Sequence, residues 1–140
     1  MGAGVDTLSG FVNLIGGNGA DKLLGTVGAN RIDGGPGNDT IRGLAGNDVL
    51  IGGTGINTVS YAGNVKAVKV SLAVGVAQNT LGAGVDTLSG FLNVTGGNAA
   101  DTLTGNAGKN TLNGGPGTDH CNGGAGVDIG ISCEVKTGIP

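Results

Sequence analysis

A nine-residue period restricts the fold of this chain more than any other feature of its sequence. From Gly16 the chain reads GGNGADKLL, GTVGANRID, GGPGNDTIR, GLAGNDVLI and GGTGINTVS, and from Gly96 it reads GGNAADTLT, GNAGKNTLN, GGPGTDHCN and GGAGVDIGI. One further nonapeptide precedes each array, MGAGVDTLS at 1–9 and LGAGVDTLS at 81–89. Self-similarity at a short fixed period indicates a repeat architecture, in which each unit buries its apolar face by stacking on its neighbours.

The sixth position of every nonapeptide holds Asp or Asn. Its occupants are Asp6, Asp21, Asn30, Asp39, Asp48, Asn57, Asp86, Asp101, Asn110, Asp119 and Asp128. Of the ten acidic residues in the chain, only Asp33 and Glu134 lie elsewhere. Asp and Asn favour turns because their side chains bond the local backbone, but that preference does not concentrate acids at one position in nine. The pattern therefore indicates a function beyond turn formation.

The eighth position is apolar in all but one copy. Its occupants are Leu8, Leu23, Ile32, Ile41, Leu50, Val59, Leu88, Leu103, Leu112 and Cys121, and Gly130 is the exception. The seventh and ninth positions are mixed and mostly polar, which is the period of a very short strand with one buried face. Each nonapeptide is therefore predicted to be a six-residue turn followed by a three-residue strand, with glycines where the backbone needs positive φ or close approach.

The composition excludes several classes of protein. With 33 glycines, three aromatic residues and no tryptophan, any core must be thin and aliphatic, so something besides burial must contribute to folding. A net charge of −3 with seven scattered Lys and Arg residues argues against nucleic-acid binding. No apolar run reaches the roughly 18 residues of a membrane span, and no signal peptide is visible. Met1 replaces the Leu81 of the second copy, so we expect it to start a processed or excised segment.

The consensus GGxGxDxUx, where U is aliphatic, resembles the calcium-binding nonapeptide of the RTX (repeats-in-toxin) family. The resemblance covers nearly the whole chain, and eleven copies hold the register. It implies an all-β, right-handed parallel β-roll (a β-solenoid) in which two nonapeptides make one turn. Repeats n and n+2 then stack on the same side, with calcium ions between the stacked Gly/Asp loops.

Carried onto this sequence, the resemblance implies five or more calcium sites. The sixth-position pairs are Asp21 with Asp39, Asn30 with Asp48, Asp39 with Asn57, Asp101 with Asp119, and Asn110 with Asp128. Backbone carbonyls from the second and fourth positions of one loop, and the first and third of the other, would complete each shell. In the same order of sites, these come from Gly17, Gly19, Gly34 and Pro36; Gly28, Gly43 and Ala45; Gly35, Gly37, Gly52 and Thr54; Gly97, Ala99, Gly114 and Pro116; and Gly108, Gly123 and Ala125.

Several residues depart from the family pattern. Asn30, Asn57 and Asn110 keep a side-chain oxygen but lose the charge, so their sites are expected to bind calcium more weakly. Ala99 replaces a loop glycine. Asp6 and Asp86 are also expected to be ligands, although a six-residue spacer, GFVNLI or GFLNVT, follows each of their nonapeptides and breaks the period.

The chain divides into four segments on these grounds. Residues 1–60 form the first array, 61–80 a hairpin-like connector with an alternating strand and a return strand, 81–131 the second array, and 132–140 a C-terminal cap. We expect one continuous solenoid.

Cys121 and Cys133 are the only cysteines, and their even count in an extracellular type of repeat favours a disulfide over two buried thiols. A zinc site that also used His120 is a poor alternative, because adjacent strand residues point to opposite faces.

No hydrolytic or phosphate-binding motif appears, so we expect no enzymatic activity. The resemblance implies a secreted or cell-surface protein that folds on binding extracellular calcium and stabilises an attached exoprotein domain. The alternatives are a self-assembling extracellular subunit, as in a head-to-tail filament or surface layer, and an adhesin segment.

Overall fold

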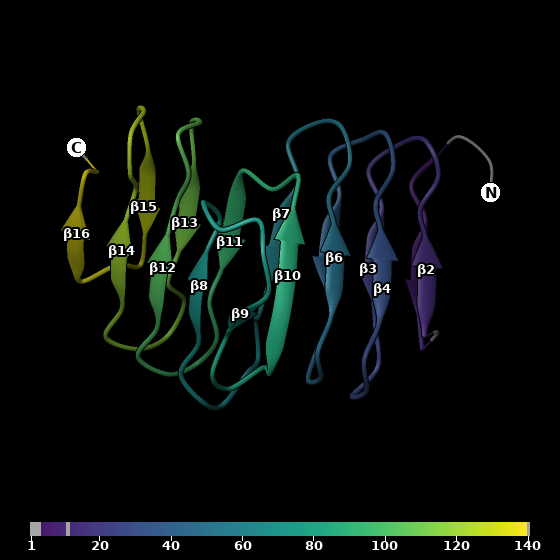
Figure 1. The fold of residues 1–140 in the computed structure, drawn as a ribbon. Helices are drawn as coiled ribbons and strands as arrows, with labels where there is room; N and C mark the ends of the chain where they lie inside the picture. The colour runs from purple at the N-terminus through teal and green to yellow at the C-terminus, as the bar shows by residue number, and fades with distance from the viewer. Residues whose placement is uncertain (1–3, 11, 140) are drawn as a thin grey trace.

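The computed structural model describes residues 4–10 and 12–139, and the expectations for Met1 and for the side chain of Leu8 fall outside it. The described chain consists of sixteen short strands joined by loops, with no helix among them and hence none that could cross a membrane. Nearly all strand pairs are parallel, and the strands stack side by side along the length of the molecule (Figure 1). The prediction of an all-β parallel solenoid of the β-roll type is confirmed.

One wall of the roll is a seven-stranded parallel sheet in the order β1-β3-β5-β7-β11-β13-β15. Its strands are β1 (Thr7–Ser9), β3 (Lys22–Leu24), β5 (Thr40–Arg42), β7 (Thr58–Ser60), β11 (Asn93–Thr95), β13 (Thr111–Asn113) and β15 (Ile129–Ile131). The β7–β11 pairing, with Val59 opposite Val94, carries this sheet from the first array directly into the second.

The opposite wall is divided into two sheets. The first has the order β2-β4-β6-β10-β9 and contains β2 (Asn13–Ile15), β4 (Arg31–Asp33), β6 (Val49–Ile51), β10 (Val85–Ser89) and β9 (Gln78–Asn79). The second has the order β16-β14-β12-β8 and contains β16 (Val135–Thr137), β14 (His120–Asn122), β12 (Thr102–Thr104) and β8 (Lys69–Ser71). The division falls at the connector between the arrays.

Residues 61–80 build this junction. Strand β8 pairs in parallel with β12, so it is a strand of the roll, whereas β9 pairs antiparallel with β10. The Gln78 side chain links β8 to β9, because its amide accepts from the Ser71 N–H and donates to the Ser71 carbonyl, both at 2.8 Å. The hairpin of this region is therefore β9–β10.

The core is a double row of mostly aliphatic side chains contributed by the strands of the two walls. The eighth-position residues from Leu23 to Cys121 are all buried, and their register partners stack directly, as in Leu23 on Ile41 on Val59. A row only one side chain deep provides little apolar burial per turn. The fold therefore depends heavily on its loops.

The six-residue spacers are shortened repeats. In the first, Asn13–Ile15 forms strand β2 with Leu14 buried in the core, and in the second, Asn93–Thr95 forms β11 with Val94 buried. Three residues separate the flanking strands, Ser9 from Asn13 and Ser89 from Asn93, where a nonapeptide has six. The period is broken in the loop and preserved in the strand.

Candidate calcium-binding loops

The sixth-position side chains form a hydrogen-bonded row along each side of the roll. In the first array the N–H of Asp21 donates to Oδ1 of Asp39 at 2.8 Å, and the N–H of Asp39 donates to Oδ1 of Asn57 at 2.8 Å. The same bond joins Asn30 to Asp48, Asp101 to Asp119, and Asn110 to Asp128. The structure thus brings together all five pairs of loops that the sequence suggested, each eighteen residues apart.

The rows continue past the regular arrays. Asp6 donates its N–H to Oδ1 of Asp21 at 2.8 Å, and Asp48 donates to Oδ1 of Asp86 at 3.1 Å across 38 residues of sequence. In three carboxylates Oδ2 also accepts a hydrogen bond: in Asp86 from the hydroxyls of Tyr61 (3.0 Å) and Thr80 (3.1 Å), and in Asp21 and Asp101 from the N–H groups of Gly17 and Gly97. Protein donors therefore reach both oxygens of Asp21, Asp86 and Asp101, and the geometry favours these three less as ligands.

Four other carboxylates keep one buried oxygen without any hydrogen-bond partner. These oxygens are the Oδ2 atoms of Asp39, Asp48, Asp119 and Asp128. An acceptor that is buried and unpaired costs free energy, on the order of 1–3 kcal/mol or more when charged. A cation is the simplest partner for such an oxygen, since no donor group of the protein reaches it.

The first glycine of the loop leaves space beside this oxygen. A Cβ placed on Gly34 would collide with Oδ2 of Asp39 and with the carbonyl oxygen of Gly52 in the next turn. The corresponding glycines of other loops, such as Gly96 and Gly114, are surrounded in the same way by a carboxylate oxygen and a carbonyl oxygen of the next turn. Two oxygens of different turns thus converge beside Gly34, Gly96 and Gly114.

The loop carbonyls are partly engaged with the facing loop. Thr54 N–H donates to the Gly35 carbonyl at 3.1 Å, and Gly37 N–H donates to the Thr54 carbonyl at 3.0 Å. Gly37 has a φ of 152°, and its missing Cβ lets the Gly19 carbonyl of the preceding turn approach closely. Since a carbonyl oxygen has two lone pairs, each retains one for a further partner.

Burial raises the pKa values of three acids in these loops, Asp39, Asp48 and Asp101. Desolvation raises the pKa of Asp48 to about 6, opposed by the N–H of Asn30 and assisted by the charge of Asp86. Desolvation likewise raises the pKa of Asp39, with the Asp21 N–H opposing, and that of Asp101, with hydrogen bonds from Val68 and Gly97 opposing. Carboxylates stacked in rows are therefore poorly stabilised as anions by the protein alone.

The three sixth-position Asn residues share a feature that the sequence did not reveal. Each faces a three-residue loop and donates its side-chain N–H to a carbonyl of that loop: Asn30 to Val12 (3.2 Å), Asn57 to Gly90 (3.1 Å) and Asn110 to Leu92 (2.9 Å). The sequence did contain a sign of this pairing for Asn30 and Asn110, because each lies in the second nonapeptide after a spacer. For Asn57 the sequence contained no such sign, because residues 61–80 lie between it and the short loop that it faces.

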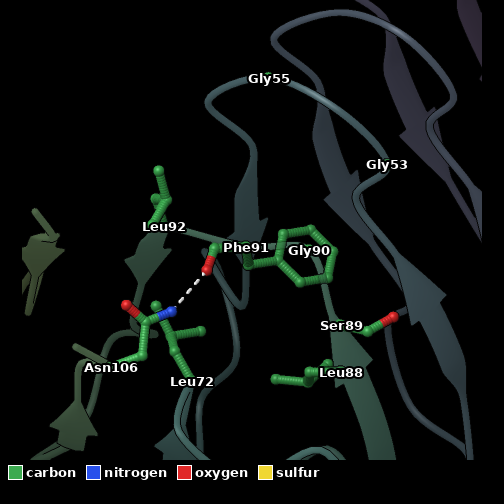
Figure 2. Close-up of a pocket in the computed structure, with 9 residues that line it drawn as sticks. All are labelled: Gly53, Gly55, Leu72, Leu88, Ser89, Gly90, Phe91, Leu92 and Asn106. Carbon is green, nitrogen blue, oxygen red and sulfur yellow. Dashed lines mark hydrogen bonds between the residues drawn. The ribbon is translucent and has the colours of Figure 1, made fainter. Parts of the chain in front are cut away.

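A recess lies above the short loop 90–92, between the longer loops on either side. Figure 2 shows its lining, with Gly53 and Gly55 from one neighbouring loop, and Asn106 from the other donating its side-chain N–H to the Phe91 carbonyl at 3.0 Å. The Phe91 side chain is buried, so an aromatic ring fills space at the turn where the Gly/Asp loop is missing.

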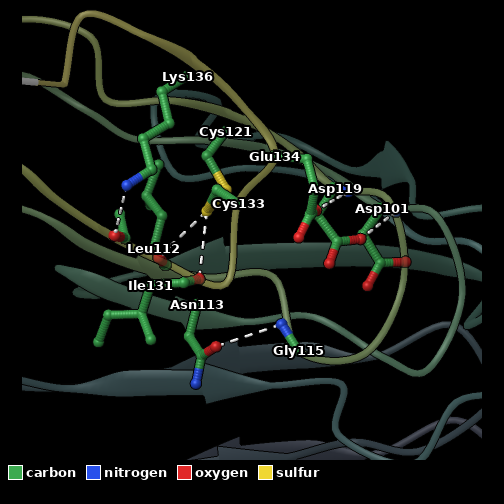
Figure 3. The surroundings of a disulfide bond; sticks show 11 residues. Asp101, Leu112, Asn113, Gly115, Asp119, Cys121, Ile131, Cys133, Glu134 and Lys136 are labelled. Atoms are coloured by element: carbon green, nitrogen blue, oxygen red, sulfur yellow. Dashed lines mark hydrogen bonds between the residues drawn. A yellow bond between two sulfur atoms is a disulfide. The ribbon is translucent and has the colours of Figure 1, made fainter.

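The C-terminal turn is held by a disulfide between Cys121 and Cys133, whose Cα atoms lie 5.9 Å apart. Both sulfurs are therefore committed, and the zinc alternative with His120 has no thiol ligand. The bridge ties the loop at 132–134 to strand β14 (Figure 3). Sequence reasoning overlooked Glu134 in this loop, whose carboxylate accepts from the Asp119 N–H at 2.6 Å and so occupies the place of a sixth-position acid.

The donor set of the loops is composed entirely of oxygen. In the described part of the chain, no group of three or more His, Cys, Asp and Glu side chains could hold a metal ion. Each stacked pair of loops instead supplies two side-chain oxygens and several carbonyls. Calcium takes six to eight such oxygen ligands, so the residues present fit this ion.

Stacked Gly-rich loops with paired buried carboxylates, on a parallel solenoid, define a calcium-binding β-roll. The model of the RTX calcium-binding nonapeptide repeat matches residues 24–59 and 95–129 in four copies, which is just over half of the chain. The chain belongs to this family, whose repeats bind calcium and are structural rather than catalytic. No curated protein matches the chain.

Proposed function

We propose that this chain is a structural module that folds when its stacked loops bind calcium outside the cell. The observation that carries the proposal is the set of buried Oδ2 atoms without partners, each beside a glycine that leaves room for a ligand. A bound Ca²⁺ supplies the positive charge that these carboxylates lack and takes carbonyl oxygens as further ligands.

Within each pair of stacked loops, the residues have distinct roles in this proposal. The sixth-position Oδ1 fixes the spacing of two loops by accepting an N–H from the preceding turn, and in Asp39, Asp48, Asp119 and Asp128 the Oδ2 is left for the cation. The first glycine keeps the cradle open, and the eighth-position side chain packs the strand into the core. The ligand residues are the eleven sixth-position residues and the loop carbonyls named above, with Asp21, Asp86 and Asp101 less suited than the other acids.

Folding and binding are one process for such a chain. The single-layer core leaves the calcium-free roll with buried, mutually repelling carboxylates, so the unfolded chain is favoured when calcium is scarce. Each site adds RT ln(1 + [Ca²⁺]/Kd) to stability, about 1.4 kcal/mol where free calcium is ten times the Kd, so several sites together supply what the core does not. Extracellular modules bind calcium in roughly the 10⁻⁴–10⁻³ M range, which would leave the chain unfolded in cytosol and folded after secretion.

A calcium titration followed by far-UV circular dichroism tests the proposal. The β signal should appear cooperatively as free calcium rises through the millimolar range, and equal magnesium should not replace it because Mg²⁺ demands a tighter octahedral shell. The Asp33→Asn variant is the matched control, since it removes one charge outside the rows. A β signal that is unchanged by calcium would overturn the proposal.

A second candidate function is self-assembly outside the cell. It is favoured by the edges of the sheets. Among the described strands, β1 and β2 at one end and β15 and β16 at the other each hydrogen-bond to a neighbouring strand on one side only. An unpaired parallel edge can template another strand. Electron microscopy and light scattering of the calcium-loaded protein separate the candidates, because filaments or a growing mass support assembly and a stable monomer excludes it.

A further inference from the structure

The last step of the roll, where the loop at 132–134 stacks on the loop at 114–119, contains two carboxylates that the repeat pattern does not pair. Figure 3 shows the side chains of Asp101, Asp119 and Glu134 following one another along the roll. The Asp119 N–H donates to Oε2 of Glu134 at 2.6 Å, as the Asp101 N–H donates to Oδ1 of Asp119 at 2.7 Å. Glu134 therefore extends the row by one turn, from a loop three residues shorter.

The short loop at 132–134 has the same construction as the short loop at 90–92. Each begins with a residue at positive φ, 48° for Ser132 and 74° for Gly90. Two successive N–H groups then donate to one carbonyl of the preceding turn: those of Glu134 and Val135 to Asp119, at 3.1 and 3.0 Å. In the other loop the N–H groups of Leu92 and Asn93 donate to the Asn57 carbonyl, at 3.2 and 3.0 Å. Position by position, Ser132 corresponds to Gly90 and Glu134 to Leu92.

The two steps differ in what fills the gap between the turns. At the internal step the Asn57 side chain donates an N–H to the Gly90 carbonyl at 3.1 Å, so a donor meets an acceptor. At the C-terminal step the corresponding side chain is Asp119, which is fully buried, and its Oδ2 has no partner. The space beside Gly114 is bounded by this oxygen and by the Ser132 carbonyl oxygen. Two acceptors face each other there with no hydrogen between them.

We propose that the C-terminal step is a further calcium site, formed by Asp119 Oδ2, the Ser132 carbonyl oxygen and the Glu134 carboxylate. The oxygens are hard donors with two negative charges, which suits a divalent cation that prefers oxygen. The exposure of Glu134 leaves room for water to complete the shell. The internal step at the loop 90–92 takes no ion, because the Asn57 amide already closes it.

The disulfide restricts the positions of two ligand residues of this site, Ser132 and Glu134. Cys133 lies between Ser132 and Glu134, and its bond to Cys121 holds both ligands against strand β14 before any ion binds. Prior ordering of ligands reduces the entropy lost on binding. We therefore expect this site to weaken when the disulfide is reduced, whereas sites in the first array should not change.

Native mass spectrometry of the calcium-loaded protein counts the bound ions. The inference rests on the proposed calcium-binding function. The Glu134→Gln variant keeps an acceptor for the Asp119 N–H but loses the charge, and it should bind one ion fewer than wild type. Asp33→Asn is the control and should bind the wild-type number. An unchanged count in Glu134→Gln overturns this site alone, whereas a wild-type chain that binds no calcium overturns the proposed function.

A crystal structure of the calcium-loaded wild-type protein gives a second test that does not depend on a variant. An ion about 2.3–2.6 Å from Asp119 Oδ2, the Ser132 carbonyl oxygen and a Glu134 oxygen supports the site. Ions in the regular loops with none at this step would overturn it.

Discussion

Replacing Asp39 tests the role of the stacked loops most directly, because Asp39 lies between Asp21 and Asn57 in its row. Its Oδ1 accepts from Asp21, its N–H donates to Asn57, and its Oδ2 is buried without a partner. The Asp39→Asn variant keeps the Oδ1 acceptor and removes only the charge. The amide N–H would then lie near the Gly52 carbonyl, as that of Asn57 lies near Gly90. The variant thus turns a cation-dependent step into an amide-closed one.

The magnitude follows from the ligand set. A site filled at 100 times its Kd contributes about 2.7 kcal/mol, so the loss of one site costs about that much and the loss of both sites that share Asp39 costs about twice as much. Asp39→Ala should cost a further 1–3 kcal/mol or so, because it also leaves the buried Asp21 N–H without its acceptor. Asp33→Asn removes an equal charge from a half-buried position outside the rows and should stay within about 0.5 kcal/mol of wild type.

Urea unfolding in saturating calcium, followed by circular dichroism, measures these differences. Wild type and Asp33→Asn should be about equally stable, Asp39→Asn less stable, and Asp39→Ala the least stable. In excess chelator, Asp39→Asn should be no less ordered than wild type, because it removes a buried charge whose pKa the protein raises by desolvation. Equal losses in calcium for Asp39→Asn and Asp33→Asn would refute the argument that the unpaired oxygen binds the ion.

Three further predictions follow from the pKa shifts, the core and the disulfide. The folded-state pKa of Asp48, about 6, lies above the unfolded value of 3.8, so the calcium-free roll should gain stability as the pH falls from 7 towards 4 and lose it as the pH rises through 6. A β signal of the calcium-free chain that decreases as the pH falls would contradict the shift. Ile41→Ala should cost about 2–5 kcal/mol in calcium by urea unfolding, because Ile41 is fully buried in a core one side chain deep, and a cost below about 1 kcal/mol would contradict that packing. Replacing Cys121 and Cys133 together with Ser should cost about 2–4 kcal/mol, and thermal unfolding with an unchanged Tm would show that the bridge adds nothing.

The sequence predicted the regular part of the roll well. A period of nine with an acid at the sixth position and an aliphatic residue at the eighth fixes both the strand length and the inward face, and the strands from β3 to β7 are three residues long as expected. The stacking of loops eighteen residues apart followed from the family resemblance, and it brings Asp39 between Asp21 and Asn57. The ligand assignments themselves stay predictions.

The sequence could not predict the places where the period changes. The spacers looked like interruptions because their loops are three residues long, although Leu14 and Val94 continue the core. Their neighbours Asn57 and Asn110 looked like weakened acids, whereas the structure shows amide donors that close the short loops. Glu134 was missed for a related reason: its longer side chain reaches from a shorter loop to the place of an Asp.

Small-angle X-ray scattering with and without calcium tests the central claim, that ion binding folds the roll, most directly. A disordered chain of this length has a radius of gyration of about 39 Å, and a compact one about 14 Å, somewhat more when elongated. The account predicts a value near the larger figure in chelator and below about 20 Å in millimolar calcium. A compact particle of the same size in chelator and in calcium would contradict it.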